Sequence, residues 1–247
     1  MENLKKRTWA EISLKNLEDN YRSIRAHLPA GTRFLGVVKA DAYGHGALQV
    51  AHLLEKCGAD YLAVSCLDEA LELRDGGVTM PILILGHTPT RFTEILIENN
   101  LTQTISNKSK AERFDRACER LGKKLKVHIK VDTGMSRLGF LCSGDMFEEG
   151  IENMAASCRL KNLDCEGIFT HFAVSDEPGE ENREYTLTQF RLFTDVINAL
   201  SDRHGISFLL FFLFGVNVQC RLDSGCRPGR GCRRRTYMLL RSETFGR

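Results

Sequence analysis

The feature that most constrains the fold is a regular alternation of short apolar runs with amphipathic helical patterns. Seven runs are apolar on both faces and bounded by polar residues or glycine, a pattern typical of strands buried in a parallel sheet. They cover residues 34–39, 60–65, 81–86, 101–106, 126–132, 166–172 and 206–211. Strands separated this often by helical segments indicate repeated βαβ units.

Helical patterns fill the intervals, and suitable capping residues mark several of their ends. Ser13 is a good N-cap for the first helix, and Gly122 and Gly205 are good stops for two later ones. The expected helices cover 14–28, 68–75, 108–121 and a long segment with an apolar stripe of Phe190, Phe193, Ile197 and Leu200.

Seven strands are one short of a closed (β/α)8 barrel. A doubly wound open sheet has the same periodicity and remains an alternative on these grounds. No run is followed by a GxGxxG or Walker-type loop, which weakens the nucleotide-binding form of the open sheet. We therefore predict an α/β fold with a barrel over residues 13–210, incomplete at about seven of eight strands, after an extended segment at 1–12.

Composition is that of an ordinary soluble protein, with 43% hydrophobic residues, 27% charged residues and a formal net charge of +2. The first fourteen residues contain no continuous apolar stretch, and the longest apolar run, 208–216, is about half the length of a spanning helix. Nine cysteines without a secretion signal favour the reduced thiols of a cytoplasm. We expect a cytoplasmic protein with no membrane or nucleic-acid partner.

The segment VVKADAYGHG, residues 37–46, carries the first candidate catalytic group. Lys39 ends an apolar run, and such a lysine lies at the C-terminal mouth of a barrel, where active sites form. Partial desolvation there favours the neutral amine, which attacks an aldehyde to form a Schiff base. The alternative is a lysine whose stem packs at the barrel rim while its amine reaches solvent.

The segment HIKVDTGMSRLG, residues 128–139, adds inward-facing charge. Alternation along a strand directs His128, Lys130 and Asp132 to one side, where unpaired charge is costly, so they form either a site or a buried network. Arg137 lies in a glycine-flanked loop and suits a carboxylate, phosphate or phenolate oxygen, or else a surface salt bridge. His171 ends a further run, and groups from several strand ends are how barrel enzymes build sites.

These segments resemble alanine racemases, which are pyridoxal-phosphate enzymes of fold type III. TWAEISLKNLEDNYRSIR, VVKADAYGHG, KVDTGMSRLGF and THFAVSDE carry the resemblance, in this order, over about residues 7–210. It implies a bacterial isomerase that interconverts L-alanine and D-alanine and supplies D-alanine for the peptidoglycan of the cell wall.

The resemblance also implies roles for individual residues. Lys39 would bind pyridoxal 5'-phosphate covalently and act as the base on the Cα proton of D-alanine. Tyr43 would hydrogen-bond the cofactor phosphate, His171 would support the cofactor ring, and Leu85 would pack against it. Arg137 would lie near the cofactor phenolate and the substrate carboxylate.

Further implications concern charge and partners. Lys130 corresponds to a lysine that is carbamylated in some members of the family and pairs with the arginine. The intact family forms a homodimer, in which a tyrosine from the partner's β-rich C-terminal domain is the second base. No metal site is implied.

Residues 211–247 depart from the family pattern, with eight arginines, no lysine and three evenly spaced cysteines, Cys220, Cys226 and Cys232. This spacing is not that of a structural zinc site, and we interpret Arg227-Pro228-Gly229, which repeats a phosphate-binding motif of the family, as coincidence. We expect a frameshift to have replaced the native continuation. Exposed edges at the first and seventh strands would then give marginal stability and weak or no racemase activity.

Two alternative functions remain. One is a non-catalytic, single-barrel pyridoxal-phosphate-binding protein, which the chain length favours. The other is a racemase of another small amino acid, such as serine.

Overall fold

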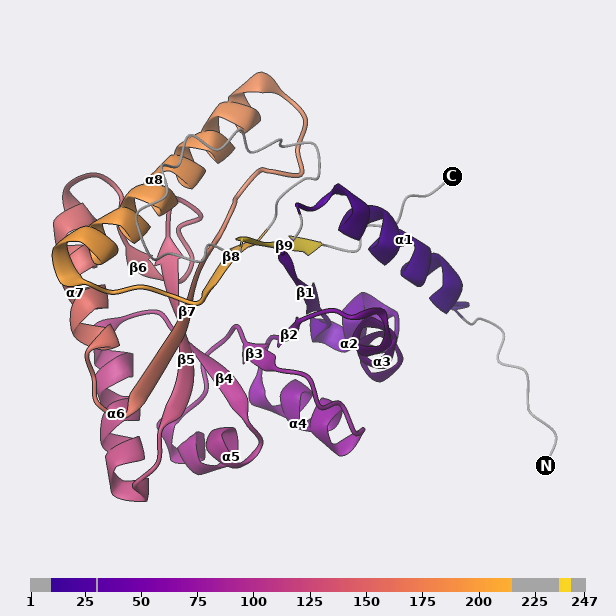
Figure 1. The fold of residues 1–247 in the computed structure, drawn as a ribbon, viewed down its shortest axis with the longest axis horizontal. Helices are drawn as coiled ribbons and strands as arrows, with labels where there is room; N and C mark the ends of the chain where they lie inside the picture. Colours follow the sequence, from indigo (N-terminus) through magenta and orange to yellow (C-terminus); the bar gives the residue numbers. More distant parts are fainter. Residues whose placement is uncertain (1–9, 30, 215–235, 241–247) are drawn as a thin grey trace.

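The computed structural model describes residues 10–29, 31–214 and 236–240, in which helices surround a ring of parallel strands (Figure 1). The strands are β1 Arg33–Val37, β2 Tyr61–Val64, β3 Ile82–Ile84, β4 Leu101–Ile105, β5 Leu125–Asp132, β6 Phe140–Leu141, β7 Leu163–His171, β8 Leu210–Phe214 and β9 Thr236–Leu240. The helices are α1 Leu14–His27, α2 Lys39–Gly44, α3 Ala47–Cys57, α4 Leu67–Asp75, α5 Thr93–Glu98, α6 Lys108–Leu121, α7 Phe147–Cys158 and α8 Glu180–His204, with 3-10 turns η1 Thr90–Phe92 and η2 Gly144–Met146.

Strand pairing confirms the barrel prediction. Parallel pairings run β1–β2–β3–β4–β5–β7–β8–β9, and β9 pairs in turn with β1. The short strand β6 pairs with β5 outside this ring. The seven predicted runs supply seven of the eight positions, so repeated βαβ units were read correctly from the sequence.

The eighth position is taken by β9, which differs from the exposed strand edges expected from the sequence. Residues 236–240 pair with β1 on one side and β8 on the other. This run was not predicted as a strand because it is only five residues long and follows an arginine-rich stretch. Arg227-Pro228-Gly229 and Cys220, Cys226 and Cys232 lie outside the described residues, as do residues 1–9 of the predicted extended segment.

Several strand boundaries also differ from the prediction, two of them in ways that matter for the site and the ring. The strand expected at 206–211 begins only at Leu210 and continues to Phe214. The first strand ends at Val37 rather than Lys39, because the chain turns sharply into α2.

Helix ends follow the capping residues. The Ser13 side chain accepts a hydrogen bond from the Asn16 N–H at 3.2 Å, as an N-cap does. Gly122 and Gly205 end α6 and α8 in the left-handed region, with φ of 62° and 66°. These three boundaries were predicted correctly.

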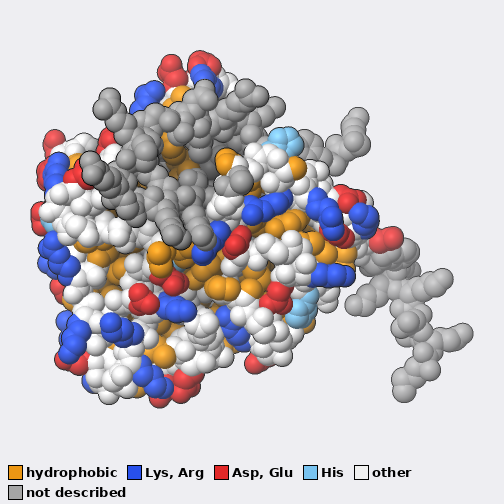
Figure 2. All heavy atoms as spheres, viewed as in Figure 1, with side chains coloured by type: hydrophobic (Ala, Val, Ile, Leu, Met, Phe, Trp, Pro, Cys, Tyr) orange, Lys and Arg blue, Asp and Glu red, His pale blue; other side chains and the backbone are white. Residues whose placement is uncertain are grey.

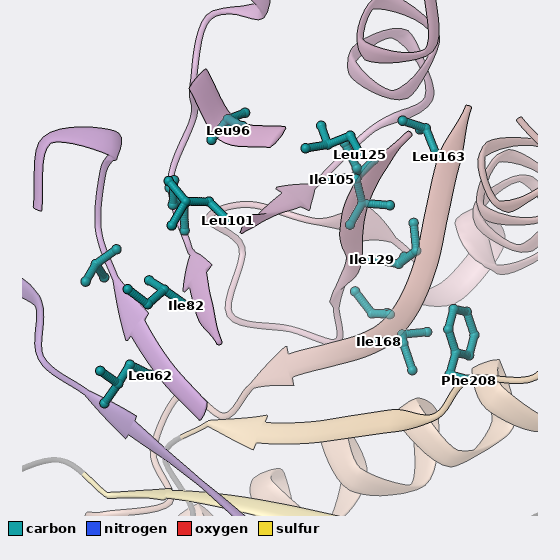
Figure 3. Packing of buried hydrophobic residues seen from close by; sticks show 14 of the residues in the cluster. Leu62, Ile82, Leu96, Leu101, Ile105, Leu125, Ile129, Leu163, Ile168 and Phe208 are labelled. Carbon is teal, nitrogen blue, oxygen red and sulfur yellow. The ribbon is translucent and has the colours of Figure 1, made fainter. Parts of the chain in front are cut away.

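Successive side chains of each strand divide between two cores, because strand side chains alternate between faces. An outer core between the strands and the helices contains Leu62, Ile82, Ile129 and Ile168 (Figure 3). An inner core inside the ring contains Leu35, Tyr61, Ala63, Leu83, Phe169 and Leu210, with Val37 and Leu85 packed against it. Any residue that continues an inward row therefore points into the barrel.

The buried face of α8 is rotated from the predicted stripe. Its buried residues are Thr186, Gln189, Phe193, Val196, Ala199 and Leu200, whereas Phe190 and Ile197 are only half-buried. A polar residue, Gln189, therefore faces the protein interior.

The described surface is mixed in charge. Figure 2 shows acidic and basic side chains interspersed with apolar ones over the face in view. Within the described residues, no helix combines the length and hydropathy needed to cross a bilayer.

We predict that Leu62→Ala lowers the free energy of unfolding by about 2–5 kcal/mol, because it leaves a cavity in the outer core. Leu62 is 0% exposed, whereas Leu209 is 73% exposed. Leu209→Ala is thus the matched control, with an expected change within about 0.5 kcal/mol. Chemical denaturation measures both, and equal losses in the two variants would contradict this division of the core.

Candidate active site

Four of the predicted site residues continue the inward rows of their strands. Lys39 follows Val37 by two positions, and Leu85 follows Leu83 by two, each just beyond the end of its strand. On β5, Lys130 lies on the inward row, with its Nζ 5.9 Å from the centre of the Phe169 ring. His171 is the last residue of β7, two positions beyond Phe169. The rows therefore bring these groups to one end of the barrel.

The segment after Lys39 is a strained left-handed turn. Four consecutive non-glycine residues, Ala40 to Tyr43, have φ between 51° and 56°. This region costs an L-residue roughly 1–2 kcal/mol. The turn returns the exposed Tyr43 ring to within 5.8 Å of Lys39 Nζ. Strain of this kind is characteristic of functional sites.

Two carboxylates hold this turn. Glu69 of α4 accepts hydrogen bonds from the Ala40 N–H at 2.8 Å and from the Ser65 N–H and Oγ at 2.7 and 2.8 Å. Asp41 accepts from the Ala47 N–H at 2.7 Å, which caps α3. The backbone beside Lys39 is thereby fixed to the next βα unit.

The loop that carries Arg137 is organised by Asp132. One carboxylate oxygen accepts the N–H groups of Gly134 and Ser136 at 2.9 and 3.0 Å, and the other accepts that of Arg137 at 3.0 Å. Gly139 closes the loop with φ of 136°, where a Cβ atom would lie 2.6 Å from the Asp132 nitrogen. The Arg137 side chain is exposed at the rim.

Burial and neighbouring positive charges lower the pKa of two groups at this end of the barrel. Burial, followed by the positive charges of Arg137, Lys130 and Lys39, lowers the pKa of His171 to about 4. Burial and the charges of Arg137 and Lys39, opposed by Asp132, lower the pKa of Lys130 to about 8. His171 is therefore neutral near pH 7, and the amine of Lys130 is readily deprotonated.

This donor set suits an anionic, planar ligand. Pyridoxal phosphate carries a phosphate and a phenolate, which three basic side chains and a tyrosine can bind. Leu85 and the neutral imidazole of His171 offer apolar and flat contact surfaces beside them. The residues present therefore fit this cofactor.

His128 belongs to a separate network within the barrel. It is fully buried, with Nε2 3.6 Å from Glu166, whose Oε1 also accepts hydrogen bonds from Tyr61 at 3.0 Å and Thr102 at 3.2 Å. Tyr61 begins β2, so this network faces the end opposite Lys39. Of the three charges predicted to face inward, His128 is in a buried network, Asp132 organises a loop and only Lys130 joins the basic cluster.

Sequence reasoning missed three residues that hold the site. Glu69 contacts the turn after Lys39, while Gln189 and Tyr185 of α8 contact the loop after β5. A polar residue on the buried face of a helix is the one signal that could have identified Gln189.

Comparison with known proteins agrees with this geometry. The family model described as "Alanine racemase, N-terminal domain" matches residues 12–211. The chain belongs to this alanine racemase family. The barrel strands β1 to β7, the Lys39 segment and the Arg137 loop all lie within the matched range.

Individual relatives point the same way. A protein named alanine racemase from Clostridium perfringens is 44% identical over 194 residues, which is 78% of this chain and 48% of that protein. One from Desulfovibrio desulfuricans is 44% identical over 196 residues, 78% of this chain and 50% of that protein. The chain thus spans about half the length of these curated relatives.

Solved structures extend the comparison. Alanine racemase of Clostridium difficile 630, in complex with cycloserine, has a TM-score of 0.81 at 35% identity, covering 96% of this chain and 61% of that one. A histidine racemase from Leuconostoc mesenteroides has a TM-score of 0.69 at 26% identity, covering 82% of this chain and 51% of that one.

Replacing one strained alanine tests the left-handed turn. Because glycine adopts positive φ without steric cost, Ala40→Gly should raise the free energy of unfolding by about 0.5–1 kcal/mol. Ala26, exposed in the right-handed helix α1, is the control: Ala26→Gly should lower it by a similar amount. Denaturant titration measures both, and a loss of stability in both variants would refute the left-handed turn.

The lowered pKa of His171 predicts an acid-sensitive fold. Between pH 6.5 and about 4 the unfolded chain binds a proton that the folded His171 does not, so stability falls as pH falls through this window. The melting temperature of the wild type should therefore fall more between pH 7 and pH 5 than the melting temperature of His171→Gln. Parallel curves for the two proteins would show that His171 is not shielded in this way.

Proposed function

We propose that this chain is the cofactor-binding barrel of a pyridoxal-phosphate-dependent amino-acid racemase that acts on alanine, with Lys39 as the cofactor lysine. The observation that carries the proposal is the convergence of Lys39, Lys130, Arg137 and His171 at one end of the barrel, given by the inward strand rows and by the loop that Asp132 holds. Like charges held this close together cost free energy, and the binding of an anion offsets that cost.

Each residue has a distinct task in this proposal. The Tyr43 hydroxyl binds the cofactor phosphate beside the strained turn. Leu85 and His171 hold the cofactor ring, and a neutral imidazole suits this position because it adds no further positive charge. Arg137, at the exposed rim, binds the phenolate and the substrate carboxylate.

Lys39 binds the cofactor covalently and transfers the Cα proton of the substrate. Pyridoxal phosphate supplies an electron sink for the charge that develops at the substrate Cα. The Lys39 amine takes the Cα proton of D-alanine from one face and returns it to the same face. Racemisation also needs a base on the opposite face, which we assign to a tyrosine of a partner subunit in a homodimer. A chain that is not paired with such a partner has a single base and therefore weak or no racemase activity.

Lys130 is the proposed site of carbamylation. Its pKa of about 8 leaves a substantial neutral fraction that can react with carbon dioxide. The carbamate would replace a positive charge that now opposes Arg137 with a negative one that pairs with it.

Named relatives support alanine as the substrate, and we extend the proposal to the supply of D-alanine for the cell wall. The Clostridium perfringens and Clostridium difficile proteins are named alanine racemases. A cytoplasmic location follows from that role. The histidine racemase keeps racemisation of another amino acid, including serine, as the second candidate. A non-catalytic cofactor-binding barrel is the third.

The adduct at Lys39 tests the proposal. Pyridoxal phosphate added to the full chain should give a visible absorption band, and borohydride should fix the cofactor to Lys39, as peptide mass spectrometry can locate. Lys39→Ala should abolish band and label, whereas the exposed Lys161→Ala should retain both. A band that survives in Lys39→Ala would overturn the assignment.

Proton exchange catalysed by the cofactor-bound chain would distinguish a racemase from a non-catalytic cofactor-binding protein. In deuterium oxide, the Lys39 amine should exchange the Cα proton of D-alanine faster than that of L-alanine, measured by NMR. Absence of exchange with a fully formed band would favour the non-catalytic candidate.

A further inference from the structure

The amide of Gln189 lies buried between the two segments that carry Arg137 and His171. It is 1% exposed, on the inner face of α8. Its Oε1 accepts a hydrogen bond from the Ala173 N–H at 2.9 Å. Its Nε2 donates to Thr133 Oγ1 at 3.3 Å and to the His171 carbonyl at 3.4 Å. One side chain thus uses both its donors and its acceptor to join the chain after β5 to the chain after β7.

These contacts continue as a directed chain of buried hydrogen bonds. Thr170 donates to the Val131 carbonyl at 3.1 Å, so at 2.8 Å from Thr133 it must accept that residue's proton. Thr133, having donated to Thr170, must accept from Gln189. Polarity therefore runs from Gln189 through both threonines to the β5 backbone. A carboxylate at position 189 could not donate the first bond.

The rest of the Arg137 loop is fixed from two other directions. Asp132 holds the N–H groups of Gly134, Ser136 and Arg137, and the Tyr185 hydroxyl donates to the Gly134 carbonyl at 2.8 Å. Tyr185 and Gln189 are one helical turn apart on α8, and the side-chain hydrogen bond of Tyr185 within the described residues goes to the loop after β5. Gln189 alone, among these residues, contacts the segments of both Arg137 and His171.

We propose that Gln189 is a positioning residue that sets Arg137 and His171 relative to each other across the cofactor site. This inference rests on the proposed function and adds a residue that lies outside the cofactor-binding set. Without the amide, the end of β7 and the loop after β5 are no longer joined and can move separately. The relative positions of the anion-binding Arg137 and the ring-supporting His171 are then no longer fixed.

The test measures cofactor binding and local opening in the full chain. Gln189→Met keeps the volume and removes all three hydrogen bonds, and it should weaken pyridoxal-phosphate binding by about tenfold, the effect of losing roughly one net hydrogen bond. Amide hydrogen exchange should speed up in both 133–137 and 172–175. Gln189→Glu retains the oxygen acceptor but not the donors, and it should resemble Gln189→Met.

Matched controls separate positioning from general destabilisation. Val196→Ala removes a buried core contact two helical turns beyond Gln189 on the same helix, and the exposed Thr188→Ala leaves that packing intact. Both should bind pyridoxal phosphate within about twofold of the wild type, the size expected for changes away from a site. Equal weakening by Val196→Ala and Gln189→Met, or wild-type binding by Gln189→Met, would overturn the inference.

Failure of the proposed function gives a different result. A wild-type chain that forms no band would refute cofactor binding at Lys39. Hydrogen exchange would then still test whether Gln189 joins the two segments. Faster exchange in both 133–137 and 172–175, seen in Gln189→Met and Gln189→Glu but not in the control variants, would support the link. Unchanged exchange in these two variants would overturn it.

Discussion

Alternation of side chains in a closed ring of parallel strands is the constraint on which the rest of this structure depends. Each strand gives one row to the helices and one to the barrel interior, and every inward row ends at the same mouth. The interior is therefore layered, with a hydrogen-bonded group around Glu166 at one end, apolar side chains in the middle and basic groups at the other. Strand length and register alone bring Lys39, Lys130 and His171 to that mouth.

Local order at the mouth comes from carboxylates and amides rather than from packing. Glu69 and Asp132 accept backbone N–H groups beside Lys39 and Arg137, and Gln189 ties the Arg137 loop to the end of β7. These bonds offset the strain of four left-handed residues and the repulsion among basic groups. The site is thus held in place by residues that contact no ligand in the proposed function.

Much of the fold and part of the site could be predicted from the sequence, because the two-residue period of strands and the periodicity of helices are local patterns. The seven strand runs, the caps at Ser13, Gly122 and Gly205, and the inward direction of Lys130 follow from neighbouring residues alone. The left-handed turn after Lys39 and the bonds of Gln189 depend on segments distant in sequence. No local pattern encodes them. The pairing of β9 was missed for a different reason, since its short run lies in a stretch of unrelated composition.

A crystal structure of the full chain grown with pyridoxal phosphate would show whether Lys39 holds the cofactor at the mouth of the barrel. We expect density continuous with Lys39 Nζ, the phosphate beside Tyr43, the ring between Leu85 and His171, and the phenolate facing Arg137. Cofactor attached to another lysine, or bound away from the mouth formed by the inward rows, would contradict it.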